Sequence, residues 1–223
     1  MAARCLLYYI TDRVQFPGGE FARRRALVDK VAEAARAGVD YIQLREKDLS
    51  ARDMEHLARE YALMIQGLRT ENRELRARLL INSRTDVALA AGADGVHLRA
   101  GDISPRDVRR AISSAGHRPL TTDHFFIAVS CHSVSDVLHA ESESADFAVF
   151  APVFEKKAAH GTHPQGLASL AEACKATIPV LALGGITLEN AQSCLDAGAA
   201  GVAGIRLFQA DKISEVVRAL RPL

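Results

Sequence analysis

The sequence predicts an α/β fold in which eight parallel strands, each followed by a helix, close into a single (β/α)8 TIM barrel. Eight short apolar runs are spread along the 223 residues, and segments with helical periodicity separate them. Strands that alternate with helices form parallel sheets through right-handed crossovers, and a count of eight favours a closed barrel over an open sheet. No linker or low-complexity tract divides the chain, so we expect residues 1–223 to form one domain.

The expected elements follow one another in regular order along the chain. The strands are expected at residues 6–10, 41–44, 79–81, 95–98, 125–129, 147–153, 180–183 and 201–205. The clearest helical periodicity between them lies in residues 22–37, 51–65, 105–113 and 188–197. This alternation continues from one end of the sequence to the other, as a barrel requires.

A repeated pattern supports closure of the barrel. The segments AGVDYIQL, AGADGVHL, SADFAVF and AGAAGVAGI each contain a helix end, a small residue and a strand. Gly38, Gly92 and Gly198 are expected to end helices in the left-handed conformation, which glycine adopts most cheaply. The matching positions 38, 92, 144 and 198 are 54, 52 and 54 residues apart, which is two strand–helix units per step. The pattern therefore indicates fourfold quasi-repeats.

Composition and charge narrow the class of protein. Hydrophobic residues make up 48% of the chain and charged residues 25%. The net charge is +1 and both signs are interspersed, so the charge pattern does not indicate nucleic acid or an anionic membrane as a partner. The four cysteines form no CxxC pair and are expected to be reduced thiols. The apolar run at residues 5–10 is too short for a signal peptide or a membrane span. The sequence predicts a cytoplasmic protein.

Polar residues gather where the expected strands end, and barrels of this kind build their active sites from loops at the carboxyl ends of the strands. The second strand runs directly into Arg45, Glu46 and Lys47. A solvated strand end would explain these charges, but their place on the catalytic rim favours ligand binding. The remaining expected strand ends carry Asn82, Asp102, Ser130, Cys131, His132, Glu155, Lys156, Lys157 and His160.

Two glycine-rich strand ends indicate a phosphate site. Gly184 and Gly185 follow the seventh strand, and Gly204 and Arg206 lie at the end of the eighth. Glycines let backbone N–H groups approach oxyanions, and barrels often bind phosphate at this place. A tight turn before a helix is the alternative for Gly184 and Gly185. His97, which alternates with apolar neighbours, is expected to point into the barrel as a hydrogen-bonded core residue.

Several segments, taken together in their order along the chain, resemble one family. They are YYITD, QLREK, INSRTDVALAAGADGVHL followed by Asp102, VSCHS, FAPVF, IPVLALGGIT and AGAAGVAGI. The chain resembles thiamin-phosphate synthase and its relatives, the TenI proteins, which include a thiazole tautomerase. The resemblance implies a TIM barrel in thiamin biosynthesis that joins hydroxymethylpyrimidine diphosphate to thiazole phosphate, releases pyrophosphate and uses Mg²⁺.

The resemblance also implies roles for individual residues. Substrate binding is expected from Gln43, Arg45, Lys47, Asn82, Lys157, Gly184, Gly185, Gly204 and Arg206, catalysis from Ser130 and His132, and magnesium binding from Asp102. Departure of diphosphate leaves a cationic pyrimidine, so fixed cations and a metal that stabilise the leaving charge lower the barrier. Arg45 can grip phosphate oxygens as a fork, while Lys47 acts as a point charge.

Three departures from the synthase pattern leave the function open. Ser83 stands where the synthases carry a second magnesium carboxylate, and a hydroxyl is a poor replacement on Mg²⁺. Since Ser83-Arg84-Thr85-Asp86 is similar to a capping box, we expect Ser83 to cap the following helix. The loop VFEKKAAHG lacks the two threonines of the synthases and is more similar to the TenI branch. Arg206 replaces a small residue and either strengthens or blocks the thiazole phosphate site.

Three functions therefore fit the sequence. A transferase that forms thiamin phosphate is favoured by QLREK and Asp102. A TenI-type isomerase, which needs no metal, is favoured by Ser83 and the VFEKKAAHG loop, and His132 would then move the proton. A non-catalytic ligand-binding or regulatory barrel is indicated only by the missing carboxylate. We favour the transferase, because an intact diphosphate motif makes little sense without a diphosphate. The expected partners are phosphorylated small molecules, and a homodimer stays open.

Overall fold

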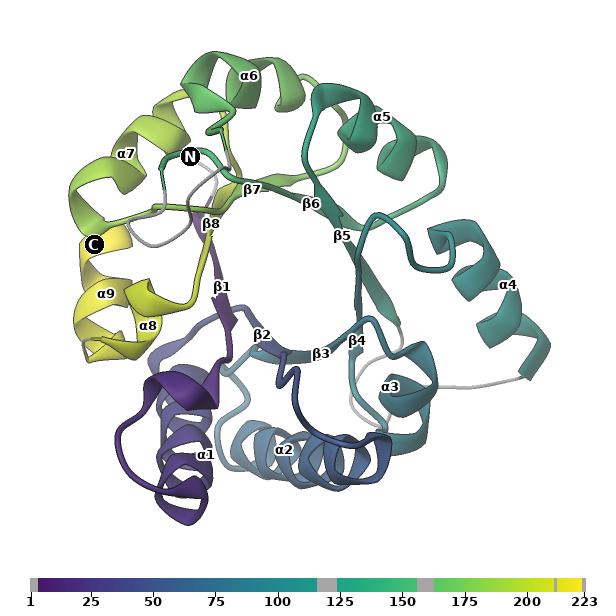
Figure 1. Ribbon diagram of the computed structural model, residues 1–223, viewed down its shortest axis with the longest axis vertical. Helices are drawn as coiled ribbons and strands as arrows, with labels where there is room; N and C mark the ends of the chain where they lie inside the picture. Colours follow the sequence, from purple (N-terminus) through teal and green to yellow (C-terminus); the bar gives the residue numbers. More distant parts are fainter. Residues whose placement is uncertain (1–3, 116–123, 156–162, 211, 222–223) are drawn as a thin grey trace.

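The computed structural model describes residues 4–115, 124–155, 163–210 and 212–221. Within these residues, eight strands form a closed parallel barrel in which each strand pairs with the next along the chain and β8 pairs with β1. The helices form an outer ring around the strands (Figure 1). The predicted (β/α)8 barrel is confirmed.

The strands are β1 (Leu6–Ile10), β2 (Tyr41–Leu44), β3 (Arg78–Asn82), β4 (Gly95–Leu98), β5 (Phe126–Cys131), β6 (Phe147–Phe150), β7 (Val180–Ala182) and β8 (Gly201–Gly204). The helices are η1 (Arg13–Gln15), α1 (Glu20–Ala37), α2 (Ala51–Glu71), α3 (Thr85–Ala91), α4 (Pro105–Ala115), α5 (Val134–Ser142), α6 (Gly166–Ala173), α7 (Leu188–Asp196), α8 (Arg206–Gln209) and α9 (Ile213–Leu220).

Two strand ends differ from the sequence expectation by two residues or more, and the other expected strand bounds hold to within one residue. Strand β6 ends at Phe150 and not at residue 153, because Pro152 has no N–H group with which to continue a sheet ladder. Strand β5 extends to Cys131, so Ser130 and Cys131 belong to the strand and do not follow it. Since side chains alternate along a strand, this extension places Ser130 and Cys131 on opposite faces of the barrel wall.

The repeated pattern has a structural basis at the helix ends. Gly38, Gly92 and Gly198 have φ values of +87°, +69° and +97°, so the predicted left-handed helix ends are confirmed. The fourth matching position, Ser144, has φ +65° although it carries a side chain. The four copies therefore share one backbone conformation, which is costly for any residue other than glycine.

The same repeats carry an aspartate two residues later, at the start of an even-numbered strand. Asp40, Asp94 and Asp146 each accept a hydrogen bond from the backbone N–H of the second residue of the preceding strand, at Leu7, Leu79 and Ile127, over 2.8, 2.7 and 2.6 Å respectively. Arg221, Arg69 and Arg109 pair with the three carboxylates in turn. We call these contacts the carboxylate staples; they join β1 to β2, β3 to β4 and β5 to β6 at the amino-terminal ends of the strands.

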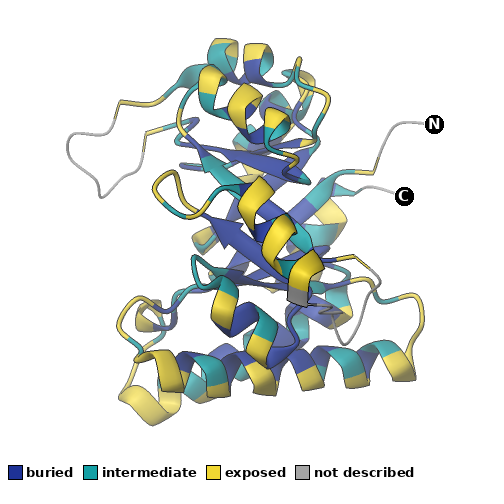
Figure 2. Ribbon diagram, turned by 90° about the vertical axis from the view of Figure 1, so that its right-hand side faces the viewer, coloured by how far each residue is buried: buried dark blue, intermediate teal, exposed yellow. Residues whose placement is uncertain are grey.

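Apolar residues fill the inside of the barrel and the space between barrel and helices. Figure 2 shows buried strands at the centre and helices whose exposed faces point outward. Inside the barrel, Tyr8, Tyr41 and Phe147 contact one another through their rings, with centroids 4.7–5.9 Å apart. The barrel interior is therefore a packed core and not a pore. In the described part of the chain, no helix has the length and apolar character needed to cross a membrane.

Candidate active site

The side chains at the carboxyl ends of the strands can be placed from the strand period of two. Tyr41, Leu80 and Ala128 line the inside of the barrel. The residues two positions further along the same strands, Gln43, Asn82 and Ser130, therefore project to the same inner side, one layer nearer the mouth. The fold thus brings three of the predicted site residues, from three different strands, to one mouth of the barrel.

His97 lies in this layer and connects two walls of the barrel. Its Nδ1 atom lies 2.9 Å from the hydroxyl of Tyr8, and its Nε2 atom lies 2.7 Å from the hydroxyl of Ser130. Burial, together with the charge of Arg45, lowers the pKa of His97 to about 3, although Asp102 acts in the opposite direction. His97 is therefore neutral near pH 7. The expectation of a hydrogen-bonded core histidine is confirmed, but sequence reasoning missed its contact with Ser130.

Ser83 does not cap the helix that follows it, so that expectation was wrong. The residue before α3 is Arg84, whose side chain makes no capping hydrogen bond. Ser83 itself has φ +61°, a left-handed conformation that is incompatible with the extended backbone of a capping serine. Its hydroxyl instead accepts a hydrogen bond from Asn82 Nδ2 over 3.2 Å and also contacts Asp102. Ser83 belongs to the site.

Asp102 supplies the negative charge of this part of the site. Its carboxylate accepts a hydrogen bond from the backbone N–H of Arg99 over 2.8 Å and from the Arg99 guanidinium over 3.1 Å. Burial acts to raise the pKa of Asp102, but the hydrogen bonds from Arg99 and Ser83 outweigh it and lower that pKa. Asp102 is therefore ionised near pH 7. In the described ranges, no three His, Cys, Asp or Glu side chains come together as metal ligands, and Asp102 contacts the Ser83 hydroxyl, which in turn accepts a hydrogen bond from the Asn82 amide.

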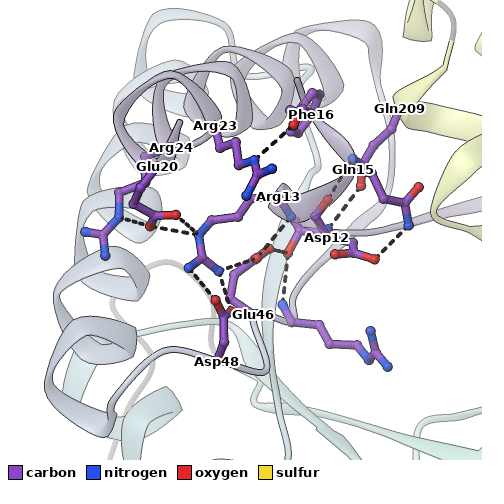
Figure 3. A network of polar contacts seen from close by, with 12 residues as sticks. Asp12, Arg13, Gln15, Phe16, Glu20, Arg23, Arg24, Glu46, Asp48 and Gln209 are labelled. Carbon is purple, nitrogen blue, oxygen red and sulfur yellow. Dashed lines mark hydrogen bonds and ion pairs between the residues drawn. The ribbon is translucent and has the colours of Figure 1, made fainter. Parts of the chain in front are cut away.

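The charged run after β2 divides into two parts with different functions. Glu46 is 3% exposed and turns away from the barrel mouth, where it accepts hydrogen bonds from the Thr11 hydroxyl (2.6 Å), the backbone N–H of Arg13 (3.0 Å) and Arg13 Nη1 (3.1 Å). Thr11 Oγ1 in turn accepts a hydrogen bond from the backbone N–H of Arg45 over 2.9 Å. Through Thr11, Glu46 therefore holds the backbone of Arg45 at the end of β2 (Figure 3).

Arg13 is the centre of this network, as Figure 3 shows. Its guanidinium donates to both carboxylate oxygens of Asp48, over 2.6 and 2.8 Å, and to Glu20 over 3.0 Å, besides its bond to Glu46. The hydrogen bond to Asp48 is the largest cause that raises the pKa of Arg13, and burial acts in the opposite direction. Burial raises the pKa of Glu46, against the hydrogen bonds from Thr11 and Arg13. Sequence reasoning missed Arg13, whose only signal was its position just after the first strand.

Arg45 and Lys47, by contrast, are left available for a ligand. Arg45 is half-buried and Lys47 is exposed. Among the residues that the structure describes, no carboxylate pairs with either of them. Two cations with no carboxylate partner in the described part of the chain thus lie at the end of a strand whose inward side chain is Gln43, while the acidic residue between them, Glu46, pairs with Arg13.

His132 and Cys131 differ in their chemistry. Burial raises the pKa of the Cys131 thiol to about 12, which makes it a poor nucleophile. His132 is exposed, and its Nδ1 atom lies 2.8 Å from the carbonyl oxygen of Ala151. Because a carbonyl only accepts, Nδ1 carries the proton and Nε2 is left as an acceptor. His132 is therefore oriented as a base.

Comparison with known proteins identifies the family. The family model described as thiamine monophosphate synthase matches residues 7–208. The chain belongs to this family. A Geobacter sulfurreducens relative, provisionally named thiamine-phosphate synthase, is 44% identical over 208 residues, which are 92% of this chain and 87% of the relative. The thiamine-phosphate synthase of Clostridium novyi is 38% identical over 203 residues, which are 89% of this chain and 88% of the relative.

A solved structure agrees with this assignment. The thiamine phosphate pyrophosphorylase of Pyrococcus furiosus superposes with a TM-score of 0.75 at 29% identity, covering 96% of this chain and 93% of that one. The family predicted from the sequence is confirmed, and with it the assignment to a thiamine-phosphate synthase-like transferase. The roles of the individual residues stay predictions.

Within the thiamine monophosphate synthase fold, the two glycines after β7 are required by packing. Gly184 and Gly185 have φ values of +98° and +67°. A Cβ atom on Gly184 would lie 2.7 Å from Pro152, and one on Gly185 would lie 2.6 Å from the carbonyl oxygen of Glu155. The tight-turn alternative thus describes their backbone, and phosphate binding there stays a prediction.

The remaining predicted residues of the thiamine monophosphate synthase site lie around the same rim or cannot be placed. Gly204 ends β8, and Arg206 is exposed at the first position of the short helix α8. No described carboxylate pairs with Arg206. Lys156, Lys157 and His160 lie outside the described residues.

Proposed function

We propose that this protein catalyses the synthase reaction, in which hydroxymethylpyrimidine diphosphate is joined to thiazole phosphate and pyrophosphate is released. The observation that carries the proposal is the division of the charged run after β2. Glu46 accepts hydrogen bonds from Arg13 and Thr11. Arg45 and Lys47 therefore lie at the rim without an acidic partner among the described residues. Two cations that no described carboxylate neutralises, beside buried polar groups, suit a ligand with several negative charges.

The chemistry follows from the charge that develops. When the bond between the pyrimidine methylene and diphosphate breaks, the diphosphate takes the electron pair and the pyrimidine carbon becomes cationic until the thiazole captures it. Arg45 and Lys47, held in place before the reaction, stabilise the leaving diphosphate without further reorganisation. The half-buried position of Arg45 strengthens this interaction, because screening by water is reduced there.

Magnesium is proposed to arrive with the diphosphate. Asp102 is ionised and contacts Ser83, whose hydroxyl bonds to Asn82, and Mg²⁺ is commonly held by one or two carboxylates together with substrate phosphates and water. The donors thus fit a metal–diphosphate complex better than a metal bound by protein alone. When bound, the ion would neutralise charge on the leaving diphosphate, and Asp102 would hold it.

The opposite side of the rim is proposed to hold the thiazole phosphate. Gly184, Gly185 and Gly204 lie at the ends of β7 and β8, followed by Arg206 on the short helix α8, an arrangement in which barrels often bind phosphate. Arg206 would add a charge-assisted hydrogen bond, and Lys157 is retained as a further donor. We also propose a single domain, a cytoplasmic location and a homodimer.

A coupled assay tests the proposed reaction. The purified protein is incubated with hydroxymethylpyrimidine diphosphate and thiazole phosphate, with and without Mg²⁺, and thiamin phosphate and pyrophosphate are both measured. We expect both products in equal amounts, and only with the metal present. The absence of both products at every magnesium concentration would refute the proposal.

A TenI-type tautomerase is the second candidate, and the orientation of His132 favours it. Its Nδ1 atom is held by the carbonyl of Ala151, which leaves Nε2 as the acceptor that proton transfer in thiazole isomerisation requires. If the protein is an isomerase, His132→Ala should lose roughly 10²–10⁴-fold in rate, the usual share of a general acid–base. Proton exchange on thiazole phosphate, followed by NMR without metal or diphosphate, measures this rate. A variant as fast as the wild type would refute the role of His132 in proton transfer. A wild type without isomerase activity would refute the isomerase function.

A further inference from the structure

A chain of buried hydrogen-bonding groups crosses the inside of the barrel from β2 to β5. Gln43 contacts the hydroxyl of Tyr8, Tyr8 contacts His97 Nδ1 over 2.9 Å, and His97 Nε2 contacts Ser130 Oγ over 2.7 Å. Gln43, Tyr8 and His97 are 2%, 0% and 3% exposed. The chain thus runs through dry protein and ends at Ser130, the one member that the sequence placed in catalysis.

The number of protons in this chain is fixed by burial. Burial raises the pKa of Tyr8 well above its usual value, so the phenol keeps its one proton. His97 is neutral near pH 7 and therefore carries one N–H, on either Nδ1 or Nε2. Two arrangements are then open: either Tyr8 donates to Nδ1 and Nε2 donates to Ser130, or every bond in the chain is reversed.

Acidity decides between the two arrangements. A phenol is a stronger acid than the N–H of a neutral imidazole, and an unprotonated imidazole nitrogen is a stronger base than a phenol oxygen. The bond from Tyr8 to His97 Nδ1 is therefore the stronger one. The Tyr8 proton therefore points at His97 Nδ1 along the 2.9 Å contact. Nε2 then carries the proton of the imidazole.

We propose that Tyr8 and His97 are positioning residues that hold Ser130 as a hydrogen-bond donor toward the ligand. With its oxygen occupied by the N–H of His97, the Ser130 hydroxyl directs its own proton into the barrel mouth, toward an oxyanion. The identity of that oxyanion as the substrate diphosphate rests on the proposed function. Ser130 and His97 have the spacing of a serine–histidine nucleophile pair, yet in this arrangement Nε2 has no lone pair to accept the serine proton.

The arrangement also gives Tyr8 a function that its apolar surroundings do not explain. Its ring packs against Tyr41 and Phe147 in the barrel core, where a phenylalanine would fill nearly the same volume. The neighbouring Tyr9 is equally buried, and no described group hydrogen-bonds its hydroxyl. Tyr9→Phe is therefore a matched control for Tyr8→Phe, since both remove one buried hydroxyl from β1.

The tautomer of His97 can be measured directly. Long-range ¹H–¹⁵N NMR spectra of ligand-free protein with labelled histidine distinguish the two ring nitrogens, and the His97 signals are assigned by their loss in His97→Gln. We expect the proton on Nε2 in the wild type and in Tyr9→Phe. Tyr8→Phe should move at least part of the population to the Nδ1-protonated form, because the donor to Nδ1 is gone. A wild-type His97 protonated on Nδ1 would overturn the proposal.

Binding and rate measurements test the consequence for Ser130. With inorganic pyrophosphate as the probe in calorimetry, Ser130→Ala should weaken binding about fivefold to tenfold, the share of one hydrogen bond. In the coupled assay, Tyr8→Phe should lower kcat by a similar factor while Tyr9→Phe stays near the wild type. His97→Gln, whose amide can present an N–H near the position of Nε2, should keep more activity than His97→Leu. Equal activity of these two variants would overturn the proposal.

The NMR result does not depend on the reaction. A protein that makes no thiamin phosphate but has His97 protonated on Nε2 would refute the proposed function and support the positioning of Ser130 by Tyr8 and His97. An active synthase with His97 protonated on Nδ1 would do the reverse.

Discussion

Lowering the pH should destabilise the folded protein through His97. The pKa of this residue is about 3 in the folded state, because it is buried and near Arg45, and 6.5 is the ordinary value that the unfolded chain should show. Between these two values the unfolded chain binds a proton that the folded chain does not. The free energy of unfolding therefore falls as the pH falls below 6.5, and the contribution is fully present only above that value.

The expected size follows from the two pKa values. Each pH unit below 6.5 costs about 1.4 kcal/mol, so His97 alone removes about 2.7 kcal/mol between pH 8 and pH 4.5. Other groups titrate over the same range, but they are shared with the variant His97→Gln, which cannot take up this proton. The wild type should therefore lose about 2.7 kcal/mol more than His97→Gln over this range.

Urea unfolding of both proteins at several pH values measures this difference. A direct check uses the wild type alone, because the ring protons of His97 in the NMR spectrum should not titrate above pH 4.5. Parallel losses of stability in the two proteins would refute the reasoning, and so would a His97 signal that titrates near pH 6.5. Either result would mean that His97 is hydrated or paired with a charge in solution.

Three further predictions concern the rim. Arg45→Ala should weaken pyrophosphate binding in calorimetry by roughly 1.5–3 kcal/mol, the scale of a hydrogen bond to a charged group, and an unchanged affinity would count against its role. Glu46→Gln should lower the free energy of unfolding by about 2–3 kcal/mol, below the usual cost of breaking a buried ion pair, because Arg13 keeps its other carboxylates. Asp48→Asn, at the exposed end of the network, should cost less than about 1 kcal/mol, and equal losses for the two variants in urea unfolding would refute this ranking. Ser83→Asp adds a second hard oxygen beside Asp102 and should lower the magnesium concentration at half-maximal synthase activity. A folded Ser83→Asp protein with no such gain would favour the TenI-type candidate.

The barrel could be predicted from the sequence because its signals are local. Apolar runs mark the strands, and Gly38, Gly92 and Gly198 mark the helix ends, since each follows from the preferences of a few adjacent residues. The rim position of Arg45 also followed from local signals, because strand direction alone assigns a strand end to the catalytic face.

The sequence could not predict contacts between distant parts of the chain. Glu46 is adjacent to Arg45 and Lys47, but its partner Arg13 is 33 residues away, and only the fold brings them together. Ser83 was misassigned because a local rule for helix caps ignores the left-handed backbone that β3 imposes at its end. His97 was recognised as a core residue, whereas its bonds to Tyr8 and Ser130 depend on the curvature of the closed barrel.

The carboxylate staples have a consequence for how this fold can change over time. They lie at the amino-terminal ends of the strands, whereas the candidate site occupies the carboxyl ends, so stability and chemistry depend on separate sets of residues. The fourth repeat has Ala200 where the other three have aspartate, so the quarter made of β7 and β8 has no such carboxylate at its base. That quarter also carries the glycine motifs of the rim. A shift of β7 or β8 therefore breaks no staple, and what constrains this quarter is the packing of Gly184 and Gly185 at the rim.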